Sequence, residues 1–257
     1  MSVSSFRAEK NWNLEHAKVA RLSILQATKS LLKSRWPRSA AAYLKVKDAY
    51  RDQFVPRRNA QTIFSDIYEN NLWGNSESAS GRGSTLERTS VIRRELPALL
   101  AELRARTLLD APCGDFNWMR QTNLGEVTYL GADVVPSLIS RNRRLFDADG
   151  RKFLTLDITA DSLPAVDVIL CRDCFIHFSF RDISAALVNF QQSRSEFLLA
   201  TTHTLVQVHR DIATGQGRNV NLRLPPFNLP EPLKIIVEDS ESAKCLGLWR
   251  LDQLRLQ

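Results

Sequence analysis

The stretch LLDAPCGDFNWM, residues 108–119, decides the fold of this chain. Its two leucines predict a short buried strand that ends in Asp110 and runs into a tight Pro-Cys-Gly turn. The turn is expected to open a helix, with Asp115 as the N-cap. This order of strand, turn and helix is typical of the ligand-binding corner of a doubly wound α/β sheet, where backbone N–H groups face a ligand. We therefore expect a cofactor at this corner.

The glycines of the turn narrow the choice of cofactor. Dinucleotide sites carry G-x-G-x-x-G, because the backbone must approach a pyrophosphate closely. Here Gly114 is present, but Phe116 and Met119 occupy the other two glycine positions. The carboxylate of Asp110 would repel a phosphate and attract a cation. These features favour a positively charged nucleoside without phosphates, for which S-adenosylmethionine is the obvious candidate.

Three further apolar runs predict strands that also end in polar residues. They are VTYLGADVV at 127–135, FLTLDIT at 153–159, and VDVILCRDCFIHF at 166–178, whose first six residues predict a central strand. The first run ends near Asp133, about 20 residues after the glycine turn, where an acid accepts hydrogen bonds from ribose hydroxyls. The second run carries Asp157. Four strand ends therefore bring polar side chains to one edge of the sheet.

In this order the motifs resemble those of the class I S-adenosylmethionine-dependent methyltransferases, over residues 105–257. The resemblance implies a Rossmann-like, doubly wound, mostly parallel seven-stranded sheet and methyl transfer from S-adenosylmethionine. An N-terminal helical extension is expected in front of this sheet from the amphipathic pattern of the first residues, described below. It places the methionine part on Asp110, Cys113 and Gly114, the ribose on Asp133 and the adenine on Asp157 and Ile158, with Pro112 and Arg172 as further cofactor contacts. The turn departs from the family's commoner G-x-G at Phe116.

Composition sets broader bounds. With 257 residues, 44% hydrophobic and 25% charged, the chain has the composition of an ordinary folded enzyme. It has no apolar run long enough to span a membrane and no secretory signal pattern, so a cytoplasmic location is expected. The pair Cys171 and Cys174 forms a C-x-x-C, but Cys113 and Cys245 form no second pair at zinc spacing. We expect buried or pocket-lining thiols and no metal site.

Positive charge is concentrated in the N-terminal part of the chain. Residues 1–60 hold 13 Lys and Arg against 4 Asp and Glu, whereas residues 61–257 hold 22 against 24. We predict a basic helical arm over 1–60 and a methyltransferase domain over 61–257, with a core sheet from 105. The arm's amphipathic pattern is compatible with packing on the body, contact with an anionic membrane surface, or RNA binding. The sequence does not indicate an oligomeric state.

A segment rich in Ser and Gly lies between the arm and the sheet, within residues 61–104. It begins at Trp73 and reads W-G-x-x-E-S-x-S-G-x-G-S, and a helix is expected from Leu86 to Leu103. The segment is either a low-complexity linker or a lid that folds over the ligand. Its pattern also resembles a segment of small bacterial-type methyltransferases of uncharacterised substrate, where it likewise precedes the sheet domain.

Methyl transfer to a hydroxyl requires a base that removes the proton, and histidine suits that role. His177 follows the predicted central strand and precedes a helix N-cap pattern that starts at Ser179. We predict His177 as the base, with Asp173 orienting it or touching the cofactor. His203, at the end of the predicted strand FLLATTH, is the substitute.

The last third of the chain suggests a wall for the acceptor. A proline-rich loop at 219–233 precedes two final strands, which the resemblance expects to close the sheet with one antiparallel edge strand. The predicted substrate contacts are Trp73, His203, Arg218 and Asn219. The exposed polar residues in and beside the loop, such as Arg218, Asn221 and Asn228, suit the hydroxyl of a saccharide or small metabolite. An RNA methyltransferase that uses the basic arm, and a non-catalytic protein that keeps the fold, are the alternatives.

Overall fold

The computed structural model describes residues 59–256, and all of them fall within the unit Arg58–Gln257. Of the predicted basic arm, residues 1–58 lie outside the described part of the chain. None of the helices in the described part is long and apolar enough to cross a membrane.

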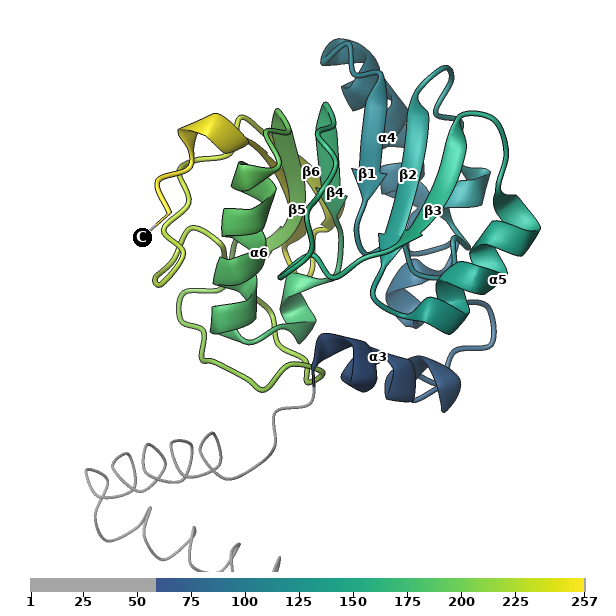
Figure 1. Ribbon diagram of the computed structural model, residues 1–257. Helices are drawn as coiled ribbons and strands as arrows, with labels where there is room; N and C mark the ends of the chain where they lie inside the picture. The colour runs from purple at the N-terminus through teal and green to yellow at the C-terminus, as the bar shows by residue number, and fades with distance from the viewer. Residues whose placement is uncertain (1–58, 257) are drawn as a thin grey trace, which may run out of the picture. The chain divides into compact units, whose positions relative to one another are not determined.

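A seven-stranded sheet forms the centre of this unit, in the order β3-β2-β1-β4-β5-β7-β6 (Figure 1). The strands are β1 Thr107–Asp110, β2 Thr128–Asp133, β3 Arg151–Thr155, β4 Val168–Cys171, β5 Phe197–His203, β6 Lys234–Asp239 and β7 Lys244–Arg250. All pairings among the first five strands are parallel. The predicted doubly wound, mostly parallel sheet is confirmed.

The antiparallel strand does not lie where the sequence analysis expected it. β7 pairs antiparallel with β5 on one side and with β6 on the other, so the edge strand β6 runs in the direction of β1–β5. The connection between β6 and β7 is short, which forces the two strands into a hairpin. β7 takes the inner position because residues 245–249 are all buried, whereas β6 exposes Ile235 and Val237.

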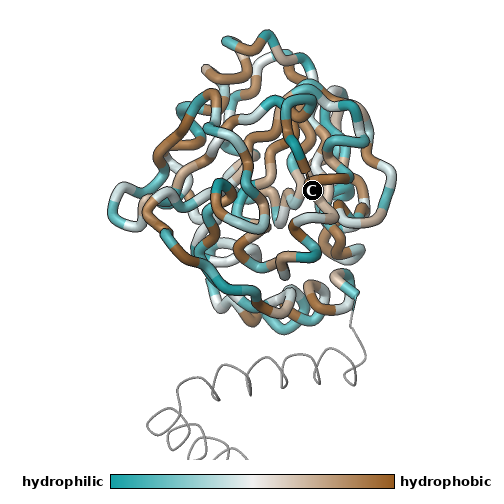
Figure 2. The backbone as a smooth tube through the Cα atoms, turned by 90° about the vertical axis from the view of Figure 1, so that its left-hand side faces the viewer, coloured by the Kyte–Doolittle hydropathy of each residue, from teal (hydrophilic) through white to brown (hydrophobic). Residues whose placement is uncertain are grey.

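Helices cover both faces of the sheet. They are α3 Ala60–Glu69, α4 Ser90–Glu102, α5 Pro136–Phe146 and α6 Phe180–Gln192, with 3₁₀ turns η1 Arg82–Ser84, η2 Met119–Gln121, η3 Phe175–His177 and η4 Leu251–Gln253. α6 packs on one face with Leu109 and Leu198, and α4 and α5 pack on the other with Leu108 and Leu199. Neighbouring strand residues thus enter opposite cores, as strand geometry requires. Figure 2 shows hydrophobic segments running through the centre of the described unit.

The helix expected after the Pro-Cys-Gly turn is absent, which corrects the prediction. The connection from β1 to β2 contains turns and the 3₁₀ segment η2 but no α-helix. Phe116 has a φ of 61°, in the left-handed region that interrupts a right-handed helix. Its ring is buried in the core, in contact with the rings of Tyr129, Phe146 and Phe153. Phe116 therefore points away from the ligand corner and does not itself restrict the choice of cofactor.

One carboxylate ties together the starts of the two central strands. Oδ2 of Asp167, just before β4, accepts hydrogen bonds from the Arg106 N–H at 2.7 Å and from the Thr107 N–H at 2.8 Å. It also accepts the Thr107 hydroxyl at 2.9 Å. Burial raises the pKa of Asp167, but these hydrogen bonds outweigh burial and hold it below its usual value. The ionised carboxylate is therefore part of the folded structure.

We predict that Asp167→Ala lowers the free energy of unfolding at neutral pH by about 2 kcal/mol, because hydrogen bonds to a charged group are lost. Urea unfolding measures the loss. Since the folded-state pKa of Asp167 is lowered, the difference from the parent protein shrinks as the pH falls through the carboxyl titration. Glu126→Ala, at an exposed position, is the control. An equal loss in both variants would contradict the role given to Asp167.

Candidate active site

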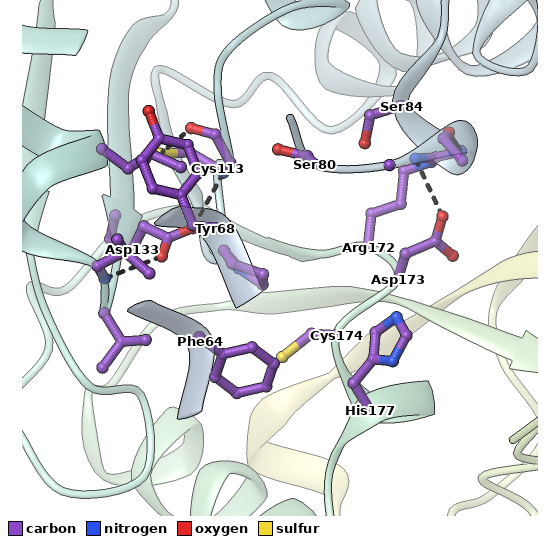
Figure 3. Close-up of a pocket in the computed structure, with 18 of the residues that line it drawn as sticks. Phe64, Tyr68, Ser80, Ser84, Cys113, Asp133, Arg172, Asp173, Cys174 and His177 are labelled. Atoms are coloured by element: carbon purple, nitrogen blue, oxygen red, sulfur yellow. Dashed lines mark hydrogen bonds and ion pairs between the residues drawn. The ribbon is translucent and has the colours of Figure 1, made fainter. Parts of the chain in front are cut away.

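The strand order reverses between β1 and β4, and such a reversal opens a crevice at the carboxyl ends of the two strands. A cavity of about 330 Å³ lies at this edge, and Figure 3 shows many of its lining side chains. The predicted residues that line it are Trp73, Asp110, Pro112, Cys113, Gly114, Asp133, Asp157, Ile158, Arg172, Asp173 and His177. Residues from five separate segments of the chain thus meet at a single cavity.

Two buried carboxylates stand at the ends of β1 and β2. Asp110 is 2% exposed and accepts a hydrogen bond from the Tyr129 hydroxyl at 2.8 Å. Asp133 accepts the Gly114 N–H at 3.2 Å and the Val135 N–H at 3.1 Å. Burial raises the pKa of Asp110 to about 7 and that of Asp133 to about 6. Neither carboxylate takes part in the ion pairs of residues 59–256, so both can attract a cationic ligand.

Asp157 and Ile158 follow β3 at the same edge. Oδ1 of Asp157 accepts the N–H of Thr159 at 2.8 Å and its hydroxyl at 2.6 Å, which fixes the turn after the strand. The Ile158 carbonyl accepts a hydrogen bond from the side-chain amide of Asn189 at 2.9 Å. Both residues are therefore held in place by Thr159 and Asn189, which do not line the cavity.

A cluster of four charged side chains, with Arg172 and Glu238 buried and Asp173 and Lys244 partly buried, supports the opposite side of the cavity. Nε of Arg172 lies 2.8 Å from Glu238, and its Nη1 lies 3.2 Å from Asp173. Nζ of Lys244 lies 2.6 Å from Asp173 and 3.5 Å from Glu238. Two cations therefore meet two anions, so Arg172 offers little net positive charge to a phosphate. Although burial raises it, the pKa of Asp173 lies below its usual value because Arg172 and Lys244 stabilise the ionised form.

His177 lies in η3, and its ring stacks on Trp73 with centroids 5.1 Å apart. Its Nδ1 lies 2.9 Å from the carbonyl oxygen of Gln216. Because a carbonyl only accepts, Nδ1 carries the proton of the neutral ring and Nε2 keeps its lone pair. Burial lowers the pKa of His177, which favours this neutral form at physiological pH.

The orienting role predicted for Asp173 falls to the Gln216 carbonyl. The Asp173 carboxylate is engaged by Lys244 and Arg172, and its backbone N–H donates to Thr201 at 2.8 Å. The carboxylate acts on His177 through charge at a distance, which raises the histidine's pKa less than burial lowers it.

Three predicted acceptor contacts do not line the cavity. His203 is buried at the end of β5, with Nδ1 3.3 Å from the Val220 carbonyl. The Arg218 guanidinium lies over the Phe180 ring and donates to the Phe175 carbonyl at 3.0 Å, and Asn219 is exposed to solvent. The loop after β5 thus packs beside η3 and α6 instead of facing the cavity.

The Ser/Gly segment covers the cavity. We call residues 77–84 the strap. Its residues 79–84 line the cavity, and Asp115 forms hydrogen bonds with its residues 78–80. The Asp115 carboxylate accepts the Ser78 hydroxyl at 3.0 Å, the Ala79 N–H at 2.8 Å and the Ser80 hydroxyl at 3.3 Å. Asp115 is therefore not the helix cap that the sequence analysis expected.

Gly114 is required by the strap. A Cβ at this position would lie 2.2 Å from Oγ of Ser80, and the residue has a φ of 54°. The Asp115 N–H donates to the same Oγ at 2.9 Å. On the other side of the strap, Arg172 donates to the Gly83 carbonyl at 3.0 Å. The strap is thus held by residues that follow the two central strands: Asp115 after β1 and Arg172 after β4.

Sequence reasoning missed the contribution of α3. Ala60, Phe64 and Tyr68 line the cavity from this helix. They are spaced four residues apart, which places them on one helix face, and this spacing was a usable signal. The four cysteines are buried and unpaired, with Cys113 and Cys174 in the cavity lining. Within residues 59–256 there is no group of three or more side chains suited to holding a metal ion.

No family model and no curated protein matches the sequence. Solved structures do match in fold. Human N-acetylserotonin methyltransferase in complex with S-adenosylmethionine has a TM-score of 0.54 and 13% identity, over 85% of this chain and 68% of that chain. A Burkholderia thailandensis enzyme, 1,6-didemethyltoxoflavin-N1-methyltransferase, has a TM-score of 0.50 and 13% identity, over 76% of this chain and 92% of that chain. The chain has the class I methyltransferase fold. At this identity the likeness concerns the fold, so the chemistry must be argued from the cavity.

We predict that Asp115→Ala releases the strap. Hydrogen–deuterium exchange at the Ala79 amide should quicken at least about tenfold, because the loss of hydrogen bonds to a carboxylate costs about 1.5–3 kcal/mol. Asp149→Ala, at an exposed turn position, should leave this amide unchanged. Equal exchange in the parent protein and Asp115→Ala would show that other contacts hold the strap.

Proposed function

We propose that the protein transfers a methyl group from S-adenosylmethionine to the hydroxyl of a small acceptor, with His177 as general base. The observation that carries this proposal is the pair of buried carboxylates, Asp110 and Asp133, at the point where the strand order reverses. A cationic, phosphate-free nucleoside matches their charge.

The cavity lining offers a partner for each part of this cofactor. Asp110 and the backbone at Gly114 would hold the methionine part, where the carboxylate faces the cationic end of the ligand. Asp133 would accept the ribose hydroxyls, and Asp157 with Ile158 would border the adenine. The single glycine of the turn is explained by the close approach of Ser80, so the departure from G-x-G is compatible with the proposed ligand.

The bound cofactor supplies a methyl group already activated by the positive sulfur. The chain's own residues then have three tasks: to bring the acceptor oxygen into line, to exclude water, and to take a proton. Positioning contributes on the order of 7–11 kcal/mol at best. The strap and α3 cover the cavity, and Nε2 of His177 accepts the hydroxyl proton.

The structure of residues 59–256 offers no support for two of the acceptor classes considered above, the saccharide and RNA. The saccharide expectation relied on the polar residues in and beside the loop at 219–233, and the predicted contacts Arg218 and Asn219 lie outside the cavity lining. The RNA alternative relied on the arm, which lies outside the described residues. We therefore keep the hydroxyl of a small metabolite, and cofactor binding itself separates this proposal from a non-catalytic protein with the same fold.

We predict that affinity for S-adenosylmethionine rises with pH. Asp110 has its pKa raised to about 7, so it is neutral below that value and attracts the sulfonium only above it. Equilibrium dialysis from about pH 5.5 to about pH 8 should show the dissociation constant falling about fivefold or more. S-adenosylhomocysteine, whose sulfur is uncharged, is the matched control and should respond less.

The variant Asp110→Asn tests whether the pH dependence of S-adenosylmethionine binding comes from the Asp110 carboxyl group. The variant should bind S-adenosylmethionine more weakly at about pH 8 and lose most of the pH dependence. Protonation of His177 would persist in this variant and is thereby separated from the carboxylate. The same pH response for both ligands, or an unchanged response in Asp110→Asn, would contradict the proposed placement of the sulfonium.

We predict that His177→Gln lowers the turnover number by about 10²–10⁴, because general base catalysis is lost. A screen of hydroxylated acceptors with labelled methyl donor supplies the assay. The dissociation constant of S-adenosylhomocysteine should stay the same, which shows that the cavity is intact. Unchanged turnover would remove His177 from the mechanism.

A further inference from the structure

The cavity has an aromatic end that the proposed cofactor contacts leave free. We call Phe64, Trp73, Ile176, His177 and Phe178 the acceptor chamber; all five line the cavity. Phe64 and Trp73 come from α3 and the segment after it, and the other three come from η3 and its next residue. Figure 3 shows Phe64, Cys174 and His177 along the lower part of the view, with Asp133 at the left and His177 at the right.

The aromatic rings of the chamber form a continuous wall. Ring centroids lie 5.8 Å apart for Phe64 and Phe178, 6.5 Å for Phe64 and Trp73, and 5.1 Å for Trp73 and His177. These contacts leave no room for a further ring between their members. An acceptor must therefore lie against the wall, where a flat apolar ring gains stacking contact as well as burial.

Hydrogen-bonding groups are scarce in the acceptor chamber. Of its five side chains, His177 offers Nε2 and Trp73 offers its indole N–H; the other three are hydrocarbon. Neither group has a hydrogen-bond partner within residues 59–256. A saccharide brings several hydroxyls, and each one buried without a partner costs roughly 1–3 kcal/mol. The chamber therefore suits an acceptor with a single hydroxyl near His177.

The chemistry of the base favours an acidic hydroxyl. Burial lowers the pKa of His177, so this ring is a weaker base than an exposed histidine. A phenol, such as the tyrosine side chain, has a pKa of about 10, whereas bulk water has a pKa near 15.7. Proton transfer to a histidine is closer to balance for a phenol than for a water-like alcohol.

We propose that the acceptor is a planar aromatic ring carrying a hydroxyl, bound in the acceptor chamber against Trp73 and Phe64 with its oxygen at Nε2 of His177. This inference rests on the proposed methyltransferase function and names its substrate class. In the step, the phenolic O–H bond breaks and the proton passes to Nε2. The oxygen forms a bond to the methyl carbon as the bond from carbon to sulfur breaks, and that electron pair stays on sulfur. The products are an aryl methyl ether, S-adenosylhomocysteine and protonated His177.

The test compares three probes on the full chain saturated with S-adenosylhomocysteine. Calorimetry and saturation-transfer NMR measure binding of 2-naphthol, cyclohexanol and methyl β-D-glucopyranoside. We expect 2-naphthol to bind at least about tenfold more tightly than the other two, and labelled S-adenosylmethionine to convert it to its methyl ether. A methyl glucoside that binds as tightly as 2-naphthol, or no binding of 2-naphthol, overturns the inference.

Variants locate the binding and separate the two levels of the proposal. Trp73→Leu and Phe64→Leu should each weaken 2-naphthol binding about fivefold or more, with affinity for S-adenosylhomocysteine unchanged. Leu205→Ala, at a site 68% exposed and outside the cavity lining, controls for adsorption to the surface. Weakening in Leu205→Ala but not in the chamber variants would overturn the inference. Failure of S-adenosylhomocysteine to bind the parent chain would overturn the proposed function itself.

Discussion

Two buried carboxylates that take no part in the ion pairs of residues 59–256 are the feature on which the account of this protein depends. Asp110 and Asp133 stand at the ends of adjacent parallel strands, where their pKa values are raised to about 7 and about 6. For Asp110, the rise from 3.8 corresponds to about 4 kcal/mol against ionisation. A cationic ligand offsets this cost, and a phosphate adds to it. The two buried carboxylates therefore favour a cationic ligand over a phosphate.

The strap covers the cavity and keeps water away from the two carboxylates. It thereby strengthens their preference for a cationic ligand. Asp115 holds the strap from the β1 side, and Arg172 holds it from the β4 side through the Gly83 carbonyl. Arg172 can do so while buried because Asp173 and Glu238 neutralise it and Lys244 completes the cluster.

Local patterns predicted most of the sheet and one side of the site. β5 matches the predicted apolar run 197–203 residue for residue, and Ser179 caps α6 by accepting the Asp182 N–H as its pattern indicated. The missing helix after Gly114 was not predictable in this way, because Asp115 bonds to residues 35–37 positions earlier in the chain. The partner of His177 was missed for the same reason: Gln216 follows it by 39 residues. Tertiary contacts at such separations leave no periodic signal in the sequence.

The most direct test of the central claim is a calorimetric comparison of two ligands on the full chain. The account predicts that S-adenosylhomocysteine binds at one site per chain and that nicotinamide adenine dinucleotide gives no binding heat, since Asp110 and Asp133 would face its diphosphate. Binding of the dinucleotide without binding of S-adenosylhomocysteine would contradict the account.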